Sequence, residues 1–300
     1  MVQRTVLAAD PPPAAAPPVR HISWAWVGVV PFLIFALLFL ILPMGLLMVG
    51  GFQDAEGHFT LANVFDLFQP SIVSAYLISI KVSAASAIGG ALVGFLLAYT
   101  AIAGGLPAWV RPTVMTFSGV ASNFAGVPLA FAFLATLGRA GLVTVLLVTL
   151  FGFNLYSTGF NLLSFAGLTL TYMYFQIPLM VLVMAPAIDG LKPAWREASA
   201  NLGAGVWDYW RYIALPILFP PVLGASLLLF ANAFGAVATA YALTGSSLSI
   251  VTILLYAQIR GDVLHNENLG YALALGMIVI TGLSNAAYIW LRGRSERWLR

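Results

Sequence analysis

The chain has 300 residues, of which 61% are apolar and only 8% are charged, whereas about 25% of the residues of an average soluble domain are charged. Thirteen Lys and Arg and ten Asp and Glu residues cannot cover a water-soluble body of this size, so the composition excludes a soluble domain and indicates an integral membrane protein. The absence of cysteine excludes disulfides, thiolate metal sites and cysteine nucleophiles. The net charge of +3 gives no indication of nucleic-acid binding, and we expect no nucleic-acid partner.

Residues 1–22 precede the first apolar segment and are rich in proline and alanine. Five prolines lie between Pro11 and Pro18, a density that does not allow a helix. We therefore expect a disordered cytoplasmic tail over residues 1–22 and a transmembrane domain over residues 23–300.

Six segments are apolar over the roughly 20 residues that a helix needs to cross the hydrocarbon core of a bilayer. In chain order they are Val27–Gly50, Ala75–Ala103, Thr113–Thr136, Leu163–Ile188, Pro216–Leu243 and Leu269–Leu291. Leu142–Phe153 is apolar over only about half of that length, which favours a short interfacial or re-entrant helix. The predicted fold class is an all-α, polytopic membrane protein with six transmembrane helices.

The distribution of Lys and Arg predicts the orientation of these spans. With the amino terminus inside, the cytoplasmic segments hold Arg4, Arg20, Arg111, Lys192, Arg196, Arg211, Arg292, Arg294, Arg297 and Arg300. The outer loops hold only Arg139 and Arg260, together with Asp54, Glu56, Asp66, Asp262 and Glu267. Because positive charge accumulates on the cytoplasmic side and the number of spans is even, we expect both termini in the cytoplasm.

The cytoplasmic loop between the fourth and fifth spans, residues 189–215, is unlike the other connections. It reads DGLKPAWREASANLGAGVWDYWRYIAL and carries six of the 23 charged residues of the chain. Pro193 suits the first turn of a helix, and Glu197 is expected near the positively polarised start of that helix. Gly203 permits a turn with positive φ. We expect a second short helix after it, with Trp207/Trp210 and Tyr209/Tyr212 facing the headgroup layer, before Pro216 starts the fifth span.

An ordinary interfacial helix pair would also explain this loop, but its sequence carries a more specific pattern. Glu197-Ala198-Ser199 is followed by three residues, Gly203, nine residues and then Ile213-Ala214-Leu215-Pro216. This spacing resembles the EAA loop of permease subunits of binding-protein-dependent ABC importers, with Ser199 in place of the usual alanine. The resemblance extends from about Ile72 to the carboxyl terminus.

The resemblance implies the fold of a type I ABC importer permease in the bacterial inner membrane. It also implies partners: cytoplasmic ABC ATPase subunits, a second permease subunit in a heterodimer, an extracytoplasmic solute-binding protein and the surrounding lipid bilayer. In such permeases the EAA loop couples the ATPases to the movement of the spans. The implied coupling residues are Arg196, Glu197, Ala198, Ser199, Gly203, Leu215 and Pro216.

The sequence contains no motif that would make the chain an enzyme. It has no GxxxxGK[ST] phosphate loop, no HExxH zinc motif and no GxSxG nucleophile elbow. We therefore expect no catalytic residues, no cofactor and no metal, and ATP hydrolysis by a partner chain.

Polar side chains within the spans are candidates for a solute pathway, although a single polar residue of this kind more often forms a helix–helix hydrogen bond. The candidates are Asn123, Gln176, Asn232, Thr239 and Tyr241.

The family pattern leaves the solute open. The layout resembles permeases of the spermidine/putrescine type, so polyamine transport is one interpretation, and thiamine, iron(III) or phosphonate are others. An alternative function is a secondary transporter without ATPase partners, but this class needs carboxylates at mid-membrane, and the six predicted spans contain no Asp or Glu.

Overall fold

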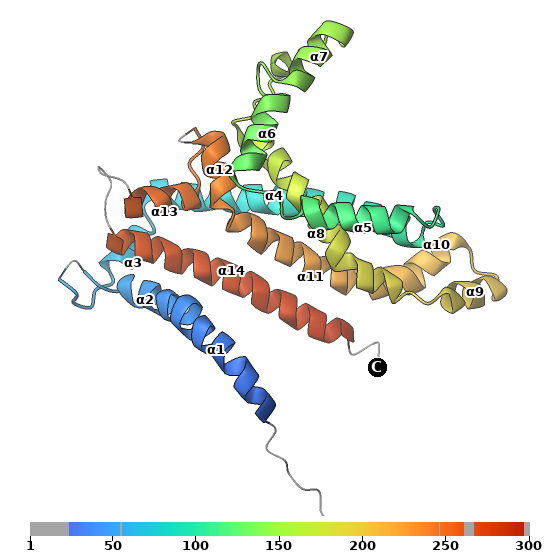
Figure 1. Cartoon of the computed structure of the whole chain (residues 1–300), viewed down its shortest axis with the longest axis horizontal. Helices are drawn as coiled ribbons and strands as arrows, with labels where there is room; N and C mark the ends of the chain where they lie inside the picture. The colour runs from blue at the N-terminus through green and yellow to red at the C-terminus, as the bar shows by residue number, and fades with distance from the viewer. Residues whose placement is uncertain (1–23, 55, 246, 261–266, 297–300) are drawn as a thin grey trace, which may run out of the picture. The chain divides into compact units, whose positions relative to one another are not determined.

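The computed structural model describes residues 24–54, 56–245, 247–260 and 267–296 (Figure 1). Within these ranges the chain is helical apart from its connections, and no strand is present, which confirms the expected all-α class. The chain divides into two units, residues 1–46 and residues 47–300, and each is described by itself. The disordered tail predicted for residues 1–22 lies outside the described residues.

The described part of the first unit is one helical run. It begins with η1 (Trp24–Val29), continues through α1 (Val30–Ala36) and the π-helical η2 (Leu37–Ile41), and passes into α2 (Leu42–Gly50). The segment Val27–Gly50 is long and apolar enough to cross a membrane, as the sequence predicted.

Four long helices form the centre of the second unit (Figure 1). They are α4 (Pro70–Ala103), α8 (Phe165–Asp189), α11 (Leu215–Phe234) and α14 (Glu267–Glu296). α4 packs on α8, and α11 contacts α4, α8 and α14. The shorter elements are α3 (Ala62–Asp66), α5 (Val110–Ala121), α6 (Val127–Leu137), α7 (Leu142–Phe151), η3 (Leu155–Thr158), α9 (Pro193–Asn201), α10 (Val206–Tyr209), η4 (Trp210–Ala214), α12 (Val237–Thr244) and α13 (Val251–Arg260). The spans predicted at 75–103, 163–188 and 269–291 correspond to α4, α8 and α14.

Glycines allow α4 and α8 to approach each other closely. A Cβ atom on Gly90 would lie 2.6 Å from the Cβ of Gln176. A Cβ atom on Gly94 would lie 2.6 Å from the backbone oxygen of Ile177 and 2.6 Å from the Cβ of Met180. Because atoms do not pack at such distances, any side chain at these two positions would force the helices apart.

α11 and α14 complete the central layer through a second set of close contacts. Gly224 of α11 faces the ring of Tyr288, and a Cβ atom there would lie 3.0 Å from the ring. The Tyr76 hydroxyl of α4 donates a hydrogen bond of 2.6 Å to the backbone oxygen of Leu273 in α14. Each of the four long helices therefore contacts at least one other of the four.

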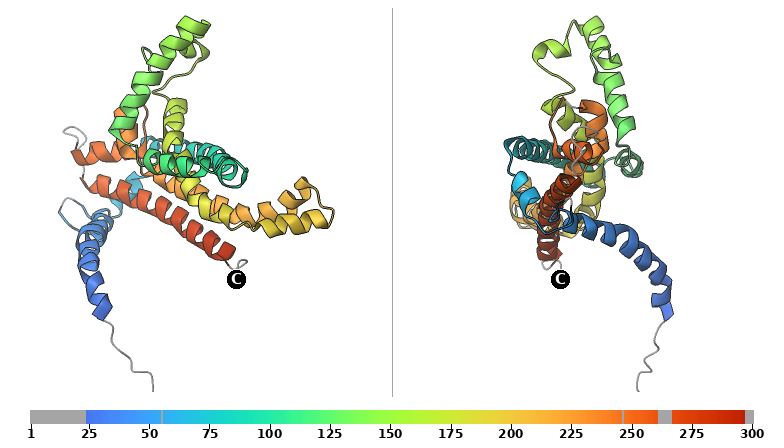
Figure 2. Two further views of the ribbon diagram at one scale, coloured as in Figure 1. Left: turned by 45° about the vertical axis from the view of Figure 1, so that its right-hand side comes forward. Right: turned by 90° about the vertical axis from the view of Figure 1, so that its left-hand side faces the viewer.

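The third predicted span, Thr113–Thr136, is not a single helix. α5 ends before residues 122–126, which are not helical, and α6 and α7 then turn away from the direction of the central helices (Figure 2). Gly126 has φ +75°, and Pro128 has no N–H to continue the helical ladder, so the chain breaks here. The segment that is long and apolar enough to span is Val127–Phe151, which includes the short helix expected at 142–153. The predicted bounds were wrong.

The fifth predicted span, Pro216–Leu243, is also wrong at both ends. The helix runs without interruption from Val206 through α10, η4 and α11 to Phe234, and this range is the candidate span. It ends because Ala236 leaves the helical region, with ψ +84°, and α12 starts one residue later. The second short helix predicted in the 189–215 loop therefore forms the first turns of the fifth candidate span, Val206–Phe234.

Both π-helical segments lie just before a proline. η2 ends two residues before Pro43, and η4 ends two residues before Pro216. A proline inside a helix cannot donate to the carbonyl four residues earlier, and its ring collides with that carbonyl. A local widening to the i→i+5 pattern accommodates the ring without ending the helix. This is why Pro216 does not start a new helix.

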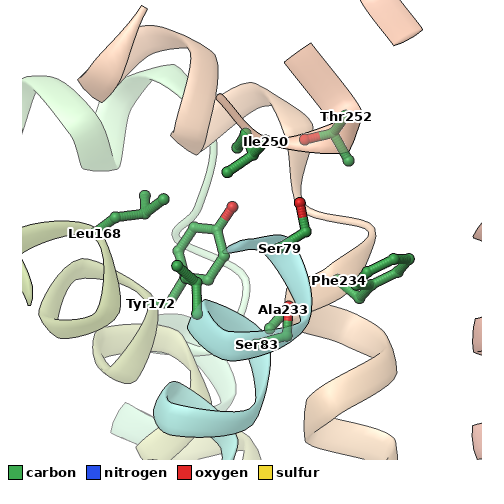
Figure 3. Close-up of a pocket in the computed structure, with 9 residues that line it drawn as sticks. Ser79, Ser83, Leu168, Tyr172, Ala233, Phe234, Ile250 and Thr252 are labelled. Atoms are coloured by element: carbon green, nitrogen blue, oxygen red, sulfur yellow. The ribbon is translucent and has the colours of Figure 1, made fainter. Parts of the chain in front are cut away.

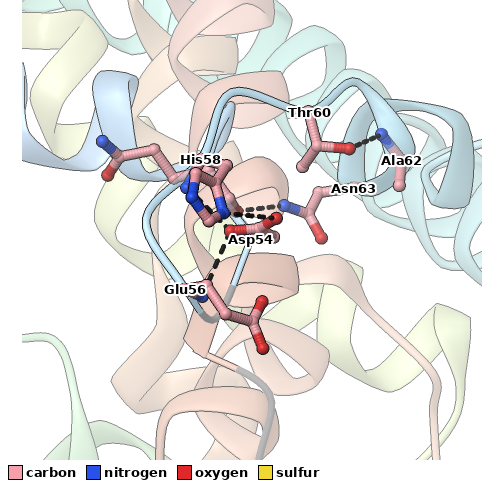
Figure 4. Close-up of polar contacts among 7 residues, drawn as sticks. Asp54, Glu56, His58, Thr60, Ala62 and Asn63 are labelled. Carbon is pink, nitrogen blue, oxygen red and sulfur yellow. Dashed lines mark hydrogen bonds and ion pairs between the residues drawn. The ribbon is translucent and has the colours of Figure 1, made fainter.

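The connection between α2 and α4 is ordered by short-range polar contacts (Figure 4). The Asp54 carboxylate accepts hydrogen bonds from the backbone N–H groups of Glu56, at 3.1 Å, and His58, at 2.8 Å. The Asn63 amide donates a hydrogen bond of 2.8 Å to the backbone oxygen of Gln53. This predicted outer loop thus has a defined turn in which the Asp54 carboxylate is engaged locally.

Candidate functional site

The loop at residues 189–215 joins the ends of two central helices, α8 and α11 (Figure 2). Its first helix, α9, begins at Pro193, as the sequence predicted. The first turn of α9 contains no acidic residue, and Glu197 lies beyond it. The expected placement of the Glu197 carboxylate at the helix start is therefore wrong. The Arg111 guanidinium of α5 pairs with the Asp189 carboxylate at 2.7 Å, which places the start of α5 on the same side as the loop.

Gly203 ends α9 in a left-handed conformation, with φ +81°. The N–H of Ala204 donates to the carbonyl of Ser199 at 3.0 Å, and the N–H of Gly203 donates to the carbonyl of Ala200 at 2.9 Å. This pair of bonds is a Schellman motif, which satisfies carbonyls that the end of a helix leaves free. The expected positive φ at Gly203 is therefore observed, and it reverses the chain between α9 and α10.

The second half of the turn is held by an acidic side chain. The N–H of Gly205 donates a hydrogen bond of 3.0 Å to the Asp208 carboxylate, three residues further into the next helix. A carboxylate in the first turn also interacts favourably with the helix dipole. The two ends of the bend, Gly203 and Gly205–Asp208, are thus separately fixed by local hydrogen bonds.

The small residues and the charged residues of the EAA segment have different surroundings. Ala198 and Ser199 line a groove of about 660 Å³ between α9 and the run formed by α10, η4 and the start of α11, and Pro216 lines its other wall. Ser199 is 8% exposed, and its hydroxyl donates a hydrogen bond of 2.8 Å to the backbone oxygen of Arg196. Arg196 and Glu197 are exposed. Ser199 therefore faces the interior of the bend, Ala198 lies at the exposed edge of the groove, and the two charged side chains face outward.

The four aromatic residues after Gly205 divide into two pairs. Trp207 and Tyr212 are 74% and 67% exposed. Tyr209 is only 8% exposed, and the ring of Trp210 lies 4.8 Å from the ring of Tyr99 at the end of α4. The expectation that all four face the headgroup layer is wrong for Tyr209 and Trp210, which join the loop to the central helices instead.

Two helix breaks lie against each other in the second unit, between α5 and α6 and between α11 and α12. The N–H of Gly126, in the first break, donates a hydrogen bond of 2.7 Å to the Thr239 hydroxyl of α12. The Tyr172 hydroxyl of α8 donates a hydrogen bond of 2.5 Å to the backbone oxygen of Ala236, in the second break. Non-helical backbone at membrane depth must find such partners within the protein.

The five pathway candidates fall into two groups in the structure. Gln176 is fully buried and donates to the Ser86 hydroxyl at 3.0 Å, and Thr239 is 1% exposed in its bond to Gly126, so both form contacts between elements. The side chains of the other candidates are exposed: Asn123 in the first break, Asn232 at the end of α11 and Tyr241 on α12. The structure does not bring these five residues together at one cavity.

Sequence reasoning missed Tyr172 and Ser79, whose hydroxyls bind backbone groups at helix ends. The Ser79 hydroxyl accepts the N–H of Val251, at the start of α13, at 2.9 Å. The available signal was the spacing of Ser79, Ser83 and Ser86, which places three hydroxyls on one face of α4. A serine stripe in an apolar helix indicates polar helix contacts, but it does not reveal their partners.

Comparison with protein families identifies the class of this molecule. Residues 90–300 match the family described as binding-protein-dependent transport system inner membrane component. The chain belongs to this family, which confirms the resemblance found in the 189–215 loop. It is a multi-pass protein of the bacterial inner membrane.

Individual relatives share part of the chain. The inner membrane ABC transporter permease protein YdcU of Escherichia coli is 31% identical over 59% of this chain, and the match spans only 59% of YdcU. The molybdenum transport system permease protein ModB of Mycobacterium tuberculosis is 27% identical over 71% of this chain and 77% of its own length. A putative ferric transport permease of Haemophilus influenzae, FbpB 1, is 27% identical over 54% of this chain and 26% of its own.

A solved structure has a similar fold. A chain of a bacterial ABC transporter involved in the import of the acidic polysaccharide alginate superposes with a TM-score of 0.68, covering 91% of this chain and 95% of that one. Its sequence identity is 19%, so this likeness concerns the fold. The fold is thus that of an ABC importer permease, as predicted.

Proposed function

We propose that the chain is a transmembrane subunit of an ATP-driven importer and that its 189–215 loop docks on separate ATPase subunits. The observation that carries this proposal is the geometry of the loop. Arg196 and Glu197 are exposed on a helix whose end is fixed at Gly203, and the loop continues directly into α8 and α11. A force applied to α9 would therefore reach two of the four central helices.

The groove beside α9 supports the same role. Its walls are mainly apolar and include Trp195, Leu202 and Tyr212, with Asp208 as a charged member. A mainly apolar groove next to exposed charges has the composition of a protein interface with an apolar centre and a polar rim. Coupling in this proposal uses Arg196 and Glu197 at the rim and Ala198, Ser199 and Pro216 in the groove. Gly203 sets the bend, and Leu215, which is 54% exposed, extends the same surface.

The assembly that we propose also includes a second permease subunit in a heterodimer and an extracytoplasmic solute-binding protein. It places both termini and the 189–215 loop in the cytoplasm, which agrees with the asymmetry of Lys and Arg. The chain itself binds lipid along its apolar exterior, hydrolyses no ATP and needs no cofactor.

The names of relatives bear on the identity of the solute. ModB and FbpB are named for molybdenum and ferric transport, and these names give no support to the polyamine interpretation. Of the interpretations drawn from the sequence, iron(III) is the one that a relative's name supports. We propose that Asn123 and Asn232, the exposed amides beside the two helix breaks, contact the solute, since Gln176 and Thr239 are buried in contacts between helices. The Asn123 amide nitrogen donates to the backbone oxygen of Gly119 at 2.9 Å, so its carbonyl oxygen is the group that would face the solute.

The proposal is tested by co-expression with a candidate ATPase and capture through a tag on this chain. We expect the ATPase to be retained by the wild-type chain and by Glu56→Lys, whose exposed carboxylate lies in the connection between α2 and α4. Glu197→Lys should lose it, because reversed charge at the rim opposes docking. Equal retention by Glu197→Lys would contradict the assigned docking surface.

A topology measurement tests the orientation separately. Single cysteines introduced at Gly57 and Gly203, in a chain that otherwise has no cysteine, should react with a membrane-impermeant thiol reagent from opposite sides. Both glycines are exposed, and a Cβ atom meets nothing within 4 Å at either position. Their φ angles of +84° and +81° strain a cysteine locally, but the side of the membrane on which each loop lies does not depend on the turn conformation. Labelling of position 203 from outside intact cells would refute the cytoplasmic assignment of the loop.

A further inference from the structure

A small cavity lies where α4, α8, α11 and α13 meet (Figure 3). Its volume is about 10 Å³, which is close to the roughly 10–15 Å³ that a single water molecule requires. Its polar lining consists of the hydroxyls of Ser79, Ser83, Tyr172 and Thr252, and the rest of the lining is apolar. These four residues are between 2% and 6% exposed, so the cavity lies among buried side chains.

Two of the four hydroxyls have no hydrogen bond among the described residues. These are the hydroxyls of Ser83 and Thr252, although each residue is more than nine-tenths buried. A ligand bound in the cavity would supply the hydrogen-bond partner that each of these hydroxyls lacks. Both therefore have an unused O–H donor.

The other two hydroxyls have already used their donors. Tyr172 donates to the backbone oxygen of Ala236 at 2.5 Å, and Ser79 donates to the backbone oxygen of Ala75 at 2.8 Å. Ser79 also accepts the N–H of Val251. Each oxygen retains an unused lone pair, because a hydroxyl can accept as well as donate. The cavity thus offers two donors and two acceptors.

We propose that this cavity binds one water molecule. Water has two donors and two acceptors, so it can donate to Tyr172 and Ser79 and accept from Ser83 and Thr252. The neutral lining contains no carboxylate to compensate a cation, and the volume excludes a larger solute. The bound water is a structural ligand that connects α4, α8 and α13.

The location gives the water a role in holding the discontinuous helices. The water contacts Tyr172, whose hydroxyl binds the backbone oxygen of Ala236 at the break between α11 and α12. The water also contacts Ser79, whose hydroxyl accepts the N–H of Val251 at the start of α13. Water at this point therefore joins two backbone contacts that hold α12 and α13, the segments that follow α11.

Radiolytic hydroxyl-radical labelling tests the proposal, because radicals formed from a bound water oxidise the side chain beside it. Tyr172 and Phe175 form an internal comparison on α8: both are 2% exposed and their rings lie 5.4 Å apart, but only Tyr172 lines the cavity. In the full-length chain in lipid nanodiscs, we expect Tyr172 to be labelled and Phe175 to remain unlabelled. Equal absence of label at both rings would mean a dry cavity and would overturn the proposal.

A pair of matched variants locates the water. Ser83→Val removes one hydroxyl and adds methyl groups to the cavity, so labelling of Tyr172 should be lost. Ser74→Val makes the same change at an exposed position nearer the start of α4, outside the cavity lining, and should leave the labelling unchanged. Persistent labelling of Tyr172 in Ser83→Val would overturn the assigned site. Should Ser83→Val not fold, Ser83→Ala reduces the labelling if the water is bound there, and unchanged labelling again overturns the proposal.

Discussion

Replacement of Gly203 by alanine tests whether the bend of the 189–215 loop requires a left-handed residue. At Gly203 φ is +81°, and a Cβ atom would meet no other atom within 4 Å, so the penalty comes from the backbone alone. For a residue with a side chain this conformation costs about 1–2 kcal/mol. A change of this size alters the ratio of closed to open turns by a factor of about 5–30.

Hydrogen exchange at the amide of Ala204 measures this ratio directly, because this N–H forms the longer of the two Schellman bonds, the one to Ser199. In Gly203→Ala we expect its exchange to be about 5–30 times faster than in the wild-type chain. Gly205→Ala is the matched control: its φ is −75°, and its Cβ would lie 3.5 Å from the Asp208 carboxylate, an ordinary contact. There the exchange should be unchanged.

The same variants connect the bend to transport. Gly203→Val, with a β-branched side chain, should insert normally but lose ATP-dependent uptake, whereas Gly205→Ala should keep it. Gly203→Asn should retain more uptake than Gly203→Val, because asparagine tolerates the left-handed region better. If the Ala204 amide exchanged equally slowly in Gly203→Ala and Gly205→Ala, the strain argument would be refuted.

Three further outcomes follow from the packing. Thr239→Val leaves a backbone N–H of the first helix break without an acceptor and should cost about 1–3 kcal/mol in thermal unfolding, whereas Tyr241→Phe, at an exposed site on the same helix, should change stability by less than about 0.5 kcal/mol. Gly94→Ala should destabilise by about 1–3 kcal/mol through overpacking against α8, and Gly119→Ala, in open space on α5, should be neutral or stabilising by the same measurement. Gln176→Leu should leave uptake intact, because the Gln176 side chain is fully buried between α4 and α8 and its carbonyl oxygen has no hydrogen-bond partner. A large loss of uptake would instead indicate that Gln176 contacts the solute.

The sequence predicted those features that depend on local chemistry. Apolar runs located α4, α8 and α14, because a span needs about 20 apolar residues whatever it packs against. The glycine pattern predicted the positive φ at Gly203, because only the local backbone determines it. Pro193 at the start of α9 followed from the same kind of reasoning, since a missing N–H costs nothing in a first turn.

The errors arose where contacts between distant segments decide the outcome. Hydropathy cannot show that the apolar run around Gly126 contains a break, because the break is stabilised by Thr239, more than a hundred residues away. Nor does it separate Tyr209 and Trp210, which pack inward, from Trp207 and Tyr212, which do not. The start of the fifth span was predicted at Pro216 because a proline usually begins or ends a helix. In the structure a π-helical turn accommodates the proline ring, so the helix starts before Pro216.

The hydroxyl groups of the chain explain how an apolar protein can contain broken helices. Each break frees backbone groups that lipid cannot satisfy, and each freed group described above is bound by a hydroxyl from another helix: Gly126 by Thr239, Ala236 by Tyr172, and Val251 by Ser79. Most polar side chains in these spans are therefore already committed to the fold. If this subunit passes a solute as we propose, the exposed amides beside the two breaks, Asn123 and Asn232, are the first candidates for contact with it, and Tyr241, nine residues after Asn232, is exposed as well.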